Sequence, residues 1–215
     1  MGHAFVSDLR RWDIVSGLCQ SIDARTYVEI GCKAGETTGR VLAECPQLSA
    51  IAIDPWCEQP KPGSFVTRLL PIGQSGMGAT VEEVSKIPED PTRETYADWD
   101  FRKIEAEFWK NVGDNSERCQ QVRTTSAECA GDVPSREVYD VVFIDALHDY
   151  TSVKEDIALW WPLVREGGYL CGHDANHRWP GVMRAVAEHF NLMDVCLGPD
   201  SMWWVQKPVA GRAAV

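Results

Sequence analysis

The chain has 215 residues, the length of one large domain, and 44% of them are hydrophobic and 25% charged, as is ordinary for a globular protein. The formal net charge of −11 would repel a polyanionic backbone, so we expect no binding to DNA or RNA. The apolar runs are too short to span a bilayer, no export or myristoylation signal is recognisable, and the eight scattered cysteines form no C-x-x-C pair, so we expect a cytoplasmic protein with no membrane association.

The first quarter of the chain reads as a helix followed by a strand, a glycine loop, a second helix and a second strand. Apolar residues recur near helical spacing through residues 1–25, which predicts an N-terminal helix with Arg11 and Trp12 off its apolar stripe. Residues 27–31 form a β-rich run that ends in glycine. A helix over 36–45 and a buried strand over 49–53, ended by Asp54-Pro55, are expected next.

Residues 56–98 differ in character, because glycines and prolines interrupt any long element there. A segment of this length inside a compact domain is uncommon unless it is functional. We therefore predict an insertion that caps a substrate site, with a partly ordered decoration as the alternative.

The second half alternates between helical and strand patterns. We expect a helix over 99–112, strands over 118–124 and 138–144, and a helix that a Ser152–Glu155 capping box begins and Gly167-Gly168 ends. A strand over 169–172 and a helix from Pro180 follow. Residues 193–197 and 202–205, joined by a Gly-Pro-Asp-Ser turn, predict an antiparallel hairpin.

This order of elements predicts one α/β domain over residues 1–215. The seven expected strands would form a Rossmann-like, doubly wound sheet with right-handed crossovers and the antiparallel C-terminal hairpin at one edge. Ligands bind such sheets beyond the carboxyl ends of the strands, where the strand order switches direction. The residues that follow each strand are therefore the candidates for function.

Two motifs at these strand ends resemble those of a known family. Residues 29–37 read E-I-G-C-K-A-G-E-T and residues 143–150 read F-I-D-A-L-H-D-Y. Together with the acidic end of the second strand, W-W-P at 160–162, G-G-Y-L at 167–170 and G-H-D at 172–174, they resemble class I S-adenosylmethionine-dependent methyltransferases, in the branch of bacterial small-molecule O-methyltransferases. The resemblance implies methyl transfer from S-adenosylmethionine to a small-molecule acceptor, most readily at an oxygen.

The resemblance also implies a cofactor site at the first strand ends. Glycines would let the backbone approach the methionine and ribose parts, Glu29 would accept from the amino group, and Asp54 would accept from two ribose hydroxyls. Helix capping or turn formation is the alternative for both acids. Trp56 could stack on adenine and Ser126 could meet its edge, or both could be structural. The cofactor-binding residues predicted in this way are Glu29, Gly31, Cys32, Gly35, Asp54, Trp56, Ser126 and Asp145.

The acceptor would lie beyond the fourth strand. His148 is the leading general base, because a neutral imidazole suits removal of a hydroxyl proton at pH 7; a structural histidine is the alternative. The catalytic residues predicted are His148, Asp145 and His173. In related metal-dependent enzymes acids at these strand ends hold a divalent ion, so Asp145 and Asp174 could bind a cation such as Mg²⁺. The match is partial, because Leu147 replaces one acid and His173 would favour a softer metal. The alternative is that Asp145 only orients His148 or the cofactor's amine.

Two other functions fit the same fold. An NAD-dependent oxidoreductase would share the acidic residue after the second strand, but Lys33 occupies the second glycine position of the G-x-G-x-x-G fingerprint. A non-catalytic nucleotide-binding module would bind without turnover. Dimerisation through the first helix or the terminal hairpin is a further expectation by analogy.

Overall fold

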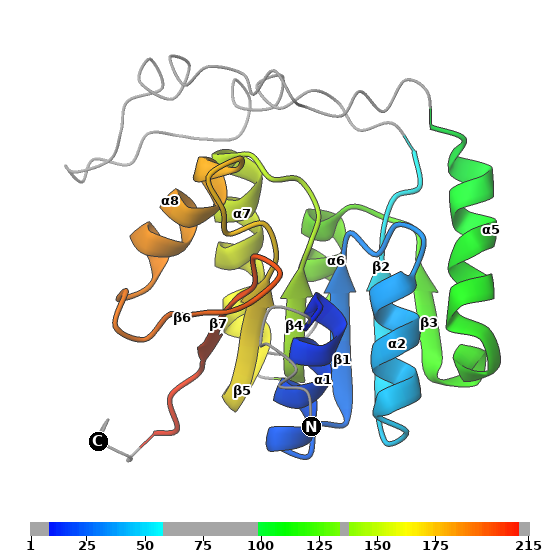
Figure 1. The fold of residues 1–215 in the computed structure, drawn as a ribbon, viewed down its shortest axis with the longest axis horizontal. Helices are drawn as coiled ribbons and strands as arrows, with labels where there is room; N and C mark the ends of the chain where they lie inside the picture. Colours follow the sequence, from blue (N-terminus) through cyan, green and yellow to red (C-terminus); the bar gives the residue numbers. More distant parts are fainter. Residues whose placement is uncertain (1–8, 58–98, 134–137, 211–215) are drawn as a thin grey trace, which may run out of the picture.

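The computed structural model describes residues 9–57, 99–133 and 138–210 (Figure 1). Seven strands form one sheet in the order β3-β2-β1-β4-β5-β7-β6. The strands are β1 (Thr26–Ile30), β2 (Ser49–Ile53), β3 (Cys119–Val122), β4 (Tyr139–Ile144), β5 (Val164–Gly172), β6 (Cys196–Leu197) and β7 (Trp203–Gln206). The first five pair in parallel, and β7 is antiparallel to both β5 and β6. The predicted Rossmann-like sheet and its antiparallel hairpin are confirmed.

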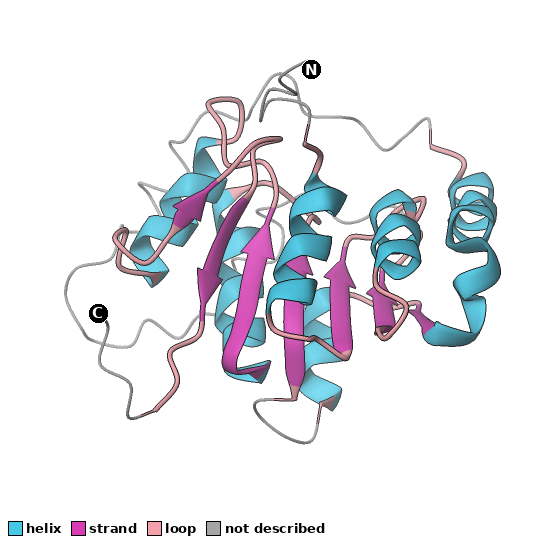
Figure 2. Ribbon diagram, turned by 60° about the horizontal axis from the view of Figure 1, so that its bottom comes forward, coloured by secondary structure: helices cyan, strands magenta, loops and turns pink. Residues whose placement is uncertain are grey.

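Helices cover both faces of the sheet (Figures 1 and 2). One face is covered by α1 (Arg11–Ser21), α2 (Glu36–Glu44) and α5 (Phe101–Val112), and the other by α6 (Ser126–Asp132), α7 (Tyr150–Trp160) and α8 (Pro180–His189). Side chains alternate between the two cores along each strand, so Tyr27 faces the first layer and Val28 the second. Both faces are buried, which explains why the central strands read as nearly continuous apolar runs.

The bounds of several elements differ from the sequence prediction. The helix expected to run to Gly167 ends at Trp160, a 3-10 turn (Trp161–Leu163) follows, and β5 already begins at Val164, where it pairs with Tyr139 of β4. The strand expected over 193–197 is reduced to Cys196–Leu197. The predicted Ser152 cap is wrong, because Asp149 precedes the helix and accepts from the backbone of Ser152 at 3.1 Å.

Two predictions lie partly or wholly outside the described residues. The insertion predicted over 56–98 falls there from residue 58 onward, as do residues 1–8 of the expected N-terminal helix. The single-domain boundary of 1–215 stays a prediction. No helix among the described residues has the length and apolar character that crossing a membrane would require.

Candidate active site

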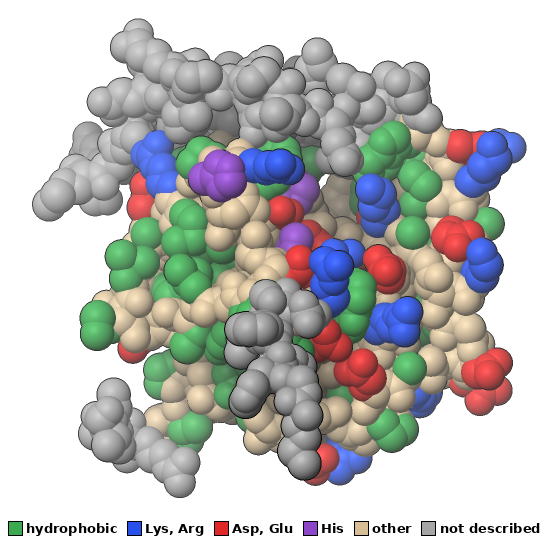
Figure 3. Space-filling view, viewed as in Figure 1, with side chains coloured by type: hydrophobic (Ala, Val, Ile, Leu, Met, Phe, Trp, Pro, Cys, Tyr) green, Lys and Arg blue, Asp and Glu red, His purple; other side chains and the backbone are tan. Residues whose placement is uncertain are grey.

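The carboxyl ends of β1 to β5 lie at one edge of the sheet, because these strands run in parallel (Figure 1). The strand order switches direction between β1, which continues to β2, and β4, which lies on its other side. Ligands bind doubly wound sheets at such a switch point. Figure 3 shows histidine, acidic and basic side chains grouped near the middle of the view.

The glycine turn after β1 is tightly packed on its neighbours. Gly31 has φ +84°, and a Cβ there would lie 2.6 Å from Ala146 Cα and closer still to the carbonyl oxygen of Asp145. Gly35 has φ +72° and precedes α2, and a Cβ there would lie 2.6 Å from the ring of Phe108. The fold itself therefore requires both glycines, since a side chain would be strained and would collide. The contact of Gly31 with Asp145 also brings the turn after β1 directly against the loop after β4.

Asp54 ties the loops after β1 and β2 together. Its Oδ2 accepts the backbone N–H of Lys33 at 3.0 Å and its Oδ1 accepts that of Trp56 at 2.7 Å. Burial raises the pKa of this carboxyl in spite of the two backbone donors. Each oxygen retains acceptor capacity for a further donor, so the carboxylate is held in place and still able to bind hydroxyl groups.

Glu29 is a buried acid beneath the start of α2. It is 2% exposed, and its Oε2 accepts from the hydroxyls of Tyr27 at 2.9 Å and Thr38 at 2.6 Å. Burial raises its pKa to about 7. Cys32 is also buried, at 4% exposure. The cofactor roles predicted for Glu29 and Cys32 stay predictions.

The side chains of Trp56 and Ser126 are engaged inside the protein. Trp56 is 2% exposed, meets the ring of Phe108 edge-on and donates from its indole to the carbonyl of Lys33 at 2.9 Å. It would have to turn out before adenine could stack on it. Ser126 donates to Asp156 and accepts from the indole of Trp160 at 2.8 Å, so its hydroxyl faces α7.

Two acids and two histidines form a cluster beyond β4 and β5. His148 Nε2 lies 2.7 Å from Asp174 Oδ2 and 3.9 Å from Asp145 Oδ1. His173 Nδ1 lies 3.1 Å from Asp174 Oδ2 and 3.6 Å from Asp145 Oδ1. The four side chains are 15% to 26% exposed. Ligand atoms of Asp145, His148 and Asp174 all lie within 4.8 Å of one another, which suits a metal ion.

The electrostatics of this cluster favour protonated histidines. Burial acts to lower the pKa of His148, but hydrogen bonds and charges from Asp145 and Asp174 outweigh it and raise the pKa to about 9. The pKa of His173 is also raised, and that of Asp174 falls well below its ordinary range despite burial, because both imidazoles bind it. The neutral imidazole expected for His148 at pH 7 is therefore the minor form in this arrangement.

A small pocket adjoins the cluster. Its volume is about 200 Å³ only when the adjoining open solvent is included, so the closed part is small. Both polar and apolar residues line it, among them Asp145, His148, His173, Val153, Val182 and Trp203.

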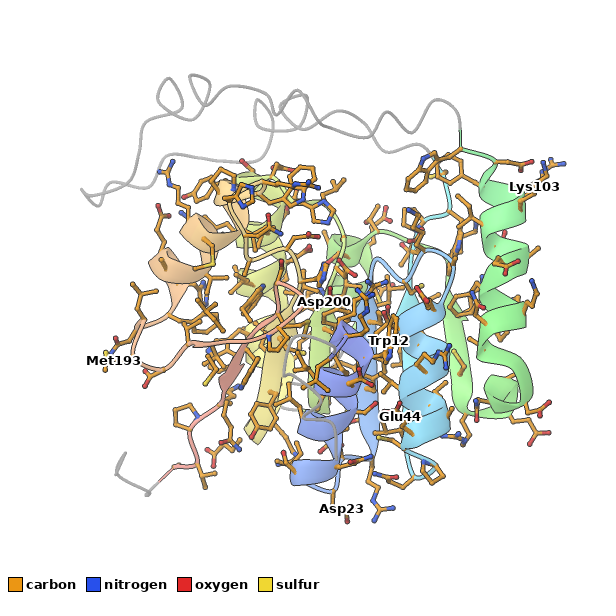
Figure 4. The ribbon with its side chains drawn as sticks, viewed as in Figure 1. Trp12, Asp23, Glu44, Lys103, Met193 and Asp200 are labelled. Carbon is orange, nitrogen blue, oxygen red and sulfur yellow. The ribbon has the colours of Figure 1, made fainter. Side chains whose placement is uncertain are left out.

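Two further polar groups at this edge were not predicted as site residues. Arg11 Nε donates to Thr37 Oγ1 at 2.8 Å and lies 3.6 Å from Asp145 Oδ2, although we expected Arg11 to point elsewhere. Asp200, labelled in Figure 4, lies on the turn between β6 and β7 at the start of α1. Its Oδ2 accepts the backbone N–H of Arg11 at 2.9 Å, and its Oδ1 lies 3.9 Å from His173 Nε2.

Comparisons with known proteins identify a family for this chain. The family model described as "Methyltransferase domain" matches residues 28–175, a span that includes the turn after β1 and the Asp/His cluster. No curated protein sequence matches the chain.

Several solved structures share the fold at low sequence identity. The O-methyltransferase NovP is 14% identical with a TM-score of 0.60, over 93% of this chain and 80% of NovP. An O-methyltransferase from Bacillus cereus, solved in complex with SAH, is 14% identical with a TM-score of 0.55, over 94% of this chain and 83% of its own. TomG from Streptomyces achromogenes, an O-methyltransferase involved in tomaymycin synthesis and solved with SAM, is 12% identical with a TM-score of 0.54, over 92% and 79%. Because the family model spans more than half of the chain, this protein belongs to the methyltransferase domain family.

Proposed function

We propose that this protein transfers a methyl group from S-adenosylmethionine to an oxygen of a small-molecule acceptor. One observation carries the proposal: the glycine turn after β1 lies directly against Asp145, so a nucleotide bound at this turn would border the Asp/His cluster. Family membership and structural neighbours solved with SAM or SAH support it. Membership in a methyltransferase family argues against the NAD-dependent oxidoreductase.

The cofactor would lie across the ends of β1 and β2. Asp54 is held by two backbone N–H groups and would accept from the ribose hydroxyls, as acids at this position do in nucleotide-binding folds. The turn at Gly31 to Gly35 would hold the methionine part, close to the buried carboxyl of Glu29. Asp145 borders this turn and would place the sulfonium methyl beside the cluster.

The donor set of the cluster fits a divalent cation. Asp145 and Asp174 offer carboxylate oxygens and His148 an imidazole nitrogen, all within 4.8 Å, and the imidazole favours a transition ion such as Mn²⁺ over Mg²⁺. The Nε2 of His148, 2.7 Å from Asp174, already places a positive charge between the two acids. A bound divalent cation would supply charge that holds an acceptor hydroxyl and lowers its pKa.

The remaining residues orient the acids and the acceptor. His173 contacts both carboxylates through Nδ1, while its buried Nε2 has no hydrogen-bond partner among the described residues. It would fix the orientation of Asp145 and Asp174 as a positioning residue. His148 as a general base would need a free, neutral Nε2, and this atom binds Asp174. We therefore favour a ligand role for His148 over the base role.

Calorimetry tests the cofactor, and mass spectrometry tests the reaction. We expect S-adenosylmethionine and S-adenosylhomocysteine to bind and NADH not to bind, and we expect phenolic or sugar hydroxyls to gain one methyl group in the presence of Mn²⁺. Binding of NADH in place of S-adenosylmethionine would overturn the proposal. Cofactor binding with no transfer to a broad acceptor panel, with or without metal, would favour the non-catalytic module.

Oligomeric state is a separate question. The dimer expected by analogy stays a prediction, and sedimentation of the full chain measures it directly.

A further inference from the structure

Arg11 places a positive charge beside Asp145, at the same edge of the sheet as the Asp/His cluster. It is the first residue of α1, and its Nε donates to Thr37 Oγ1 at 2.8 Å in the first turn of α2. The same nitrogen lies 3.6 Å from Asp145 Oδ2, and a terminal nitrogen lies 3.6 Å from Glu36 Oε2. The guanidinium therefore lies between the end of the glycine turn and the end of β4.

The guanidinium of Arg11 has N–H donors that form no hydrogen bond among the described residues. A guanidinium carries five N–H donors in a planar fork, and within the described part of the chain one side-chain hydrogen bond is formed, to Thr37. The two carboxylate contacts at 3.6 Å are ion pairs too long for hydrogen bonds. The Arg11 side chain is 26% exposed, so it is reachable by a ligand and partly shielded from water.

The backbone fixes Arg11 independently of its side chain. Its N–H donates to Asp200 Oδ2 at 2.9 Å, and Asp200 belongs to a turn that is itself bound to the loop after β5, because Ala175 donates to the carbonyl of Ser201 at 2.9 Å. Substituting the side chain leaves this anchor in place. A fixed cation loses little freedom on binding a ligand.

The proposed cofactor carries one anionic group, the carboxylate of its methionine part. The acids Glu36 and Asp145 suit the ammonium and sulfonium, whereas a carboxylate needs a cation. Lys33, in the glycine turn, has its ammonium 3.8 Å from the centre of the Trp99 ring, where it forms a cation–π contact. Planar, paired donors are the geometry that best binds a carboxylate.

We infer that Arg11 binds the carboxylate of the methionine part of the cofactor, exchanging its long contacts with Glu36 and Asp145 for a paired hydrogen bond. The inference rests on the proposed function, since it concerns the same site. It assigns to α1 a direct part in cofactor recognition, beyond covering the sheet.

A cycle of two proteins and two ligands tests this contact. S-adenosylmethionine is compared with decarboxylated S-adenosylmethionine, which retains the sulfonium, the amine and the nucleoside. We expect Arg11→Ala to lower the affinity for S-adenosylmethionine by about tenfold to a hundredfold, as for hydrogen bonds between charged groups, and to leave the affinity for the decarboxylated form unchanged. Arg11→Lys, which keeps the charge without the paired donors, should give an intermediate loss.

The neighbouring arginine provides a matched control. Arg10 is 64% exposed on its side chain and lies 3.9 Å from Asp200, so Arg10→Ala removes a similar charge from the same helix end. It should change neither affinity. The melting temperature of each variant without ligand reports any loss of folding.

The outcomes separate the two proposals. If wild-type protein binds neither form of the cofactor, the proposed function fails. If wild-type protein binds S-adenosylmethionine and folded Arg11→Ala binds it equally well, or loses affinity for both forms to the same extent, the assignment of Arg11 is overturned and the proposed function stands.

Discussion

Cation binding at the Asp/His cluster should release a proton from His148. Its pKa is about 9, so at pH 7 about one molecule in a hundred has the neutral imidazole that a metal needs. The apparent affinity for Mn²⁺ should therefore rise roughly tenfold from pH 7 to 8 and by about fiftyfold in all by pH 9. The affinity rises with pH because the proton that competes with the metal for His148 is lost as pH increases.

Calorimetry measures this exchange directly. Titrations of Mn²⁺ in two buffers of different ionisation enthalpy at pH 7 count the protons released, and we expect at least one per cation. In Asp174→Asn, which removes the acceptor 2.7 Å from His148 Nε2, the pKa of His148 should fall toward its ordinary value and the pH dependence should weaken, together with the affinity. An affinity that is constant from pH 7 to 9, with no proton released, would refute the cluster as described.

Three further perturbations test other parts of the site. Asp54→Ala should weaken S-adenosylhomocysteine binding by about tenfold to a hundredfold through loss of a charged acceptor, and an unchanged calorimetric affinity would contradict its nucleotide role. Gly31→Ala should lower the free energy of unfolding by about 2–5 kcal/mol, from a positive φ and a collision with Asp145; denaturant titration measures this, and a change near zero would argue against the packing. Without cation, the contribution of His148 to stability should be full below its unfolded pKa of about 6.5 and disappear as pH rises through about 9, so His148→Gln should flatten the melting-temperature profile over this window.

The strand ends of this protein were predictable because their position follows from topology. Parallel strands joined by helices place their carboxyl ends at one edge, so Gly31, Asp54 and Asp145 had to lie near one another wherever the helices packed. The sequence also placed His148 and Asp174 within one loop of that edge. The sequence could not predict which atoms of these residues meet. The contact between His148 and Asp174 changed the protonation state that we expected for His148.

Short elements and rotations about a helix axis were not predictable in the same way. The helix α6 begins with a capping box formed by Thr125 and Glu128, but its seven residues show no apolar period that a pattern could detect. The rotation of α1 about its axis depends on packing. Its amphipathic pattern is weak, so the sequence predicted wrongly that Arg11 points away from the site. No local signal in the sequence connects Arg11 to Asp200, 189 positions further along the chain.

The acids of this site are already neutralised by basic side chains of the protein, and a ligand that binds these acids has to compete with them. Imidazoles of raised pKa lie between the carboxylates of Asp145 and Asp174, and the guanidinium of Arg11 lies between Asp145 and Glu36. A metal cation would therefore have to replace a proton on His148, and the proposed cofactor would have to replace the long ion pairs of Arg11. Asp145 takes part in both arrangements, so in the proposed function its carboxylate would lie between the acceptor and the cofactor. Cofactor binding and cation binding can be tested separately only by substitutions that leave Asp145 in place. For this reason the decisive substitutions are those of Arg11 and Asp174.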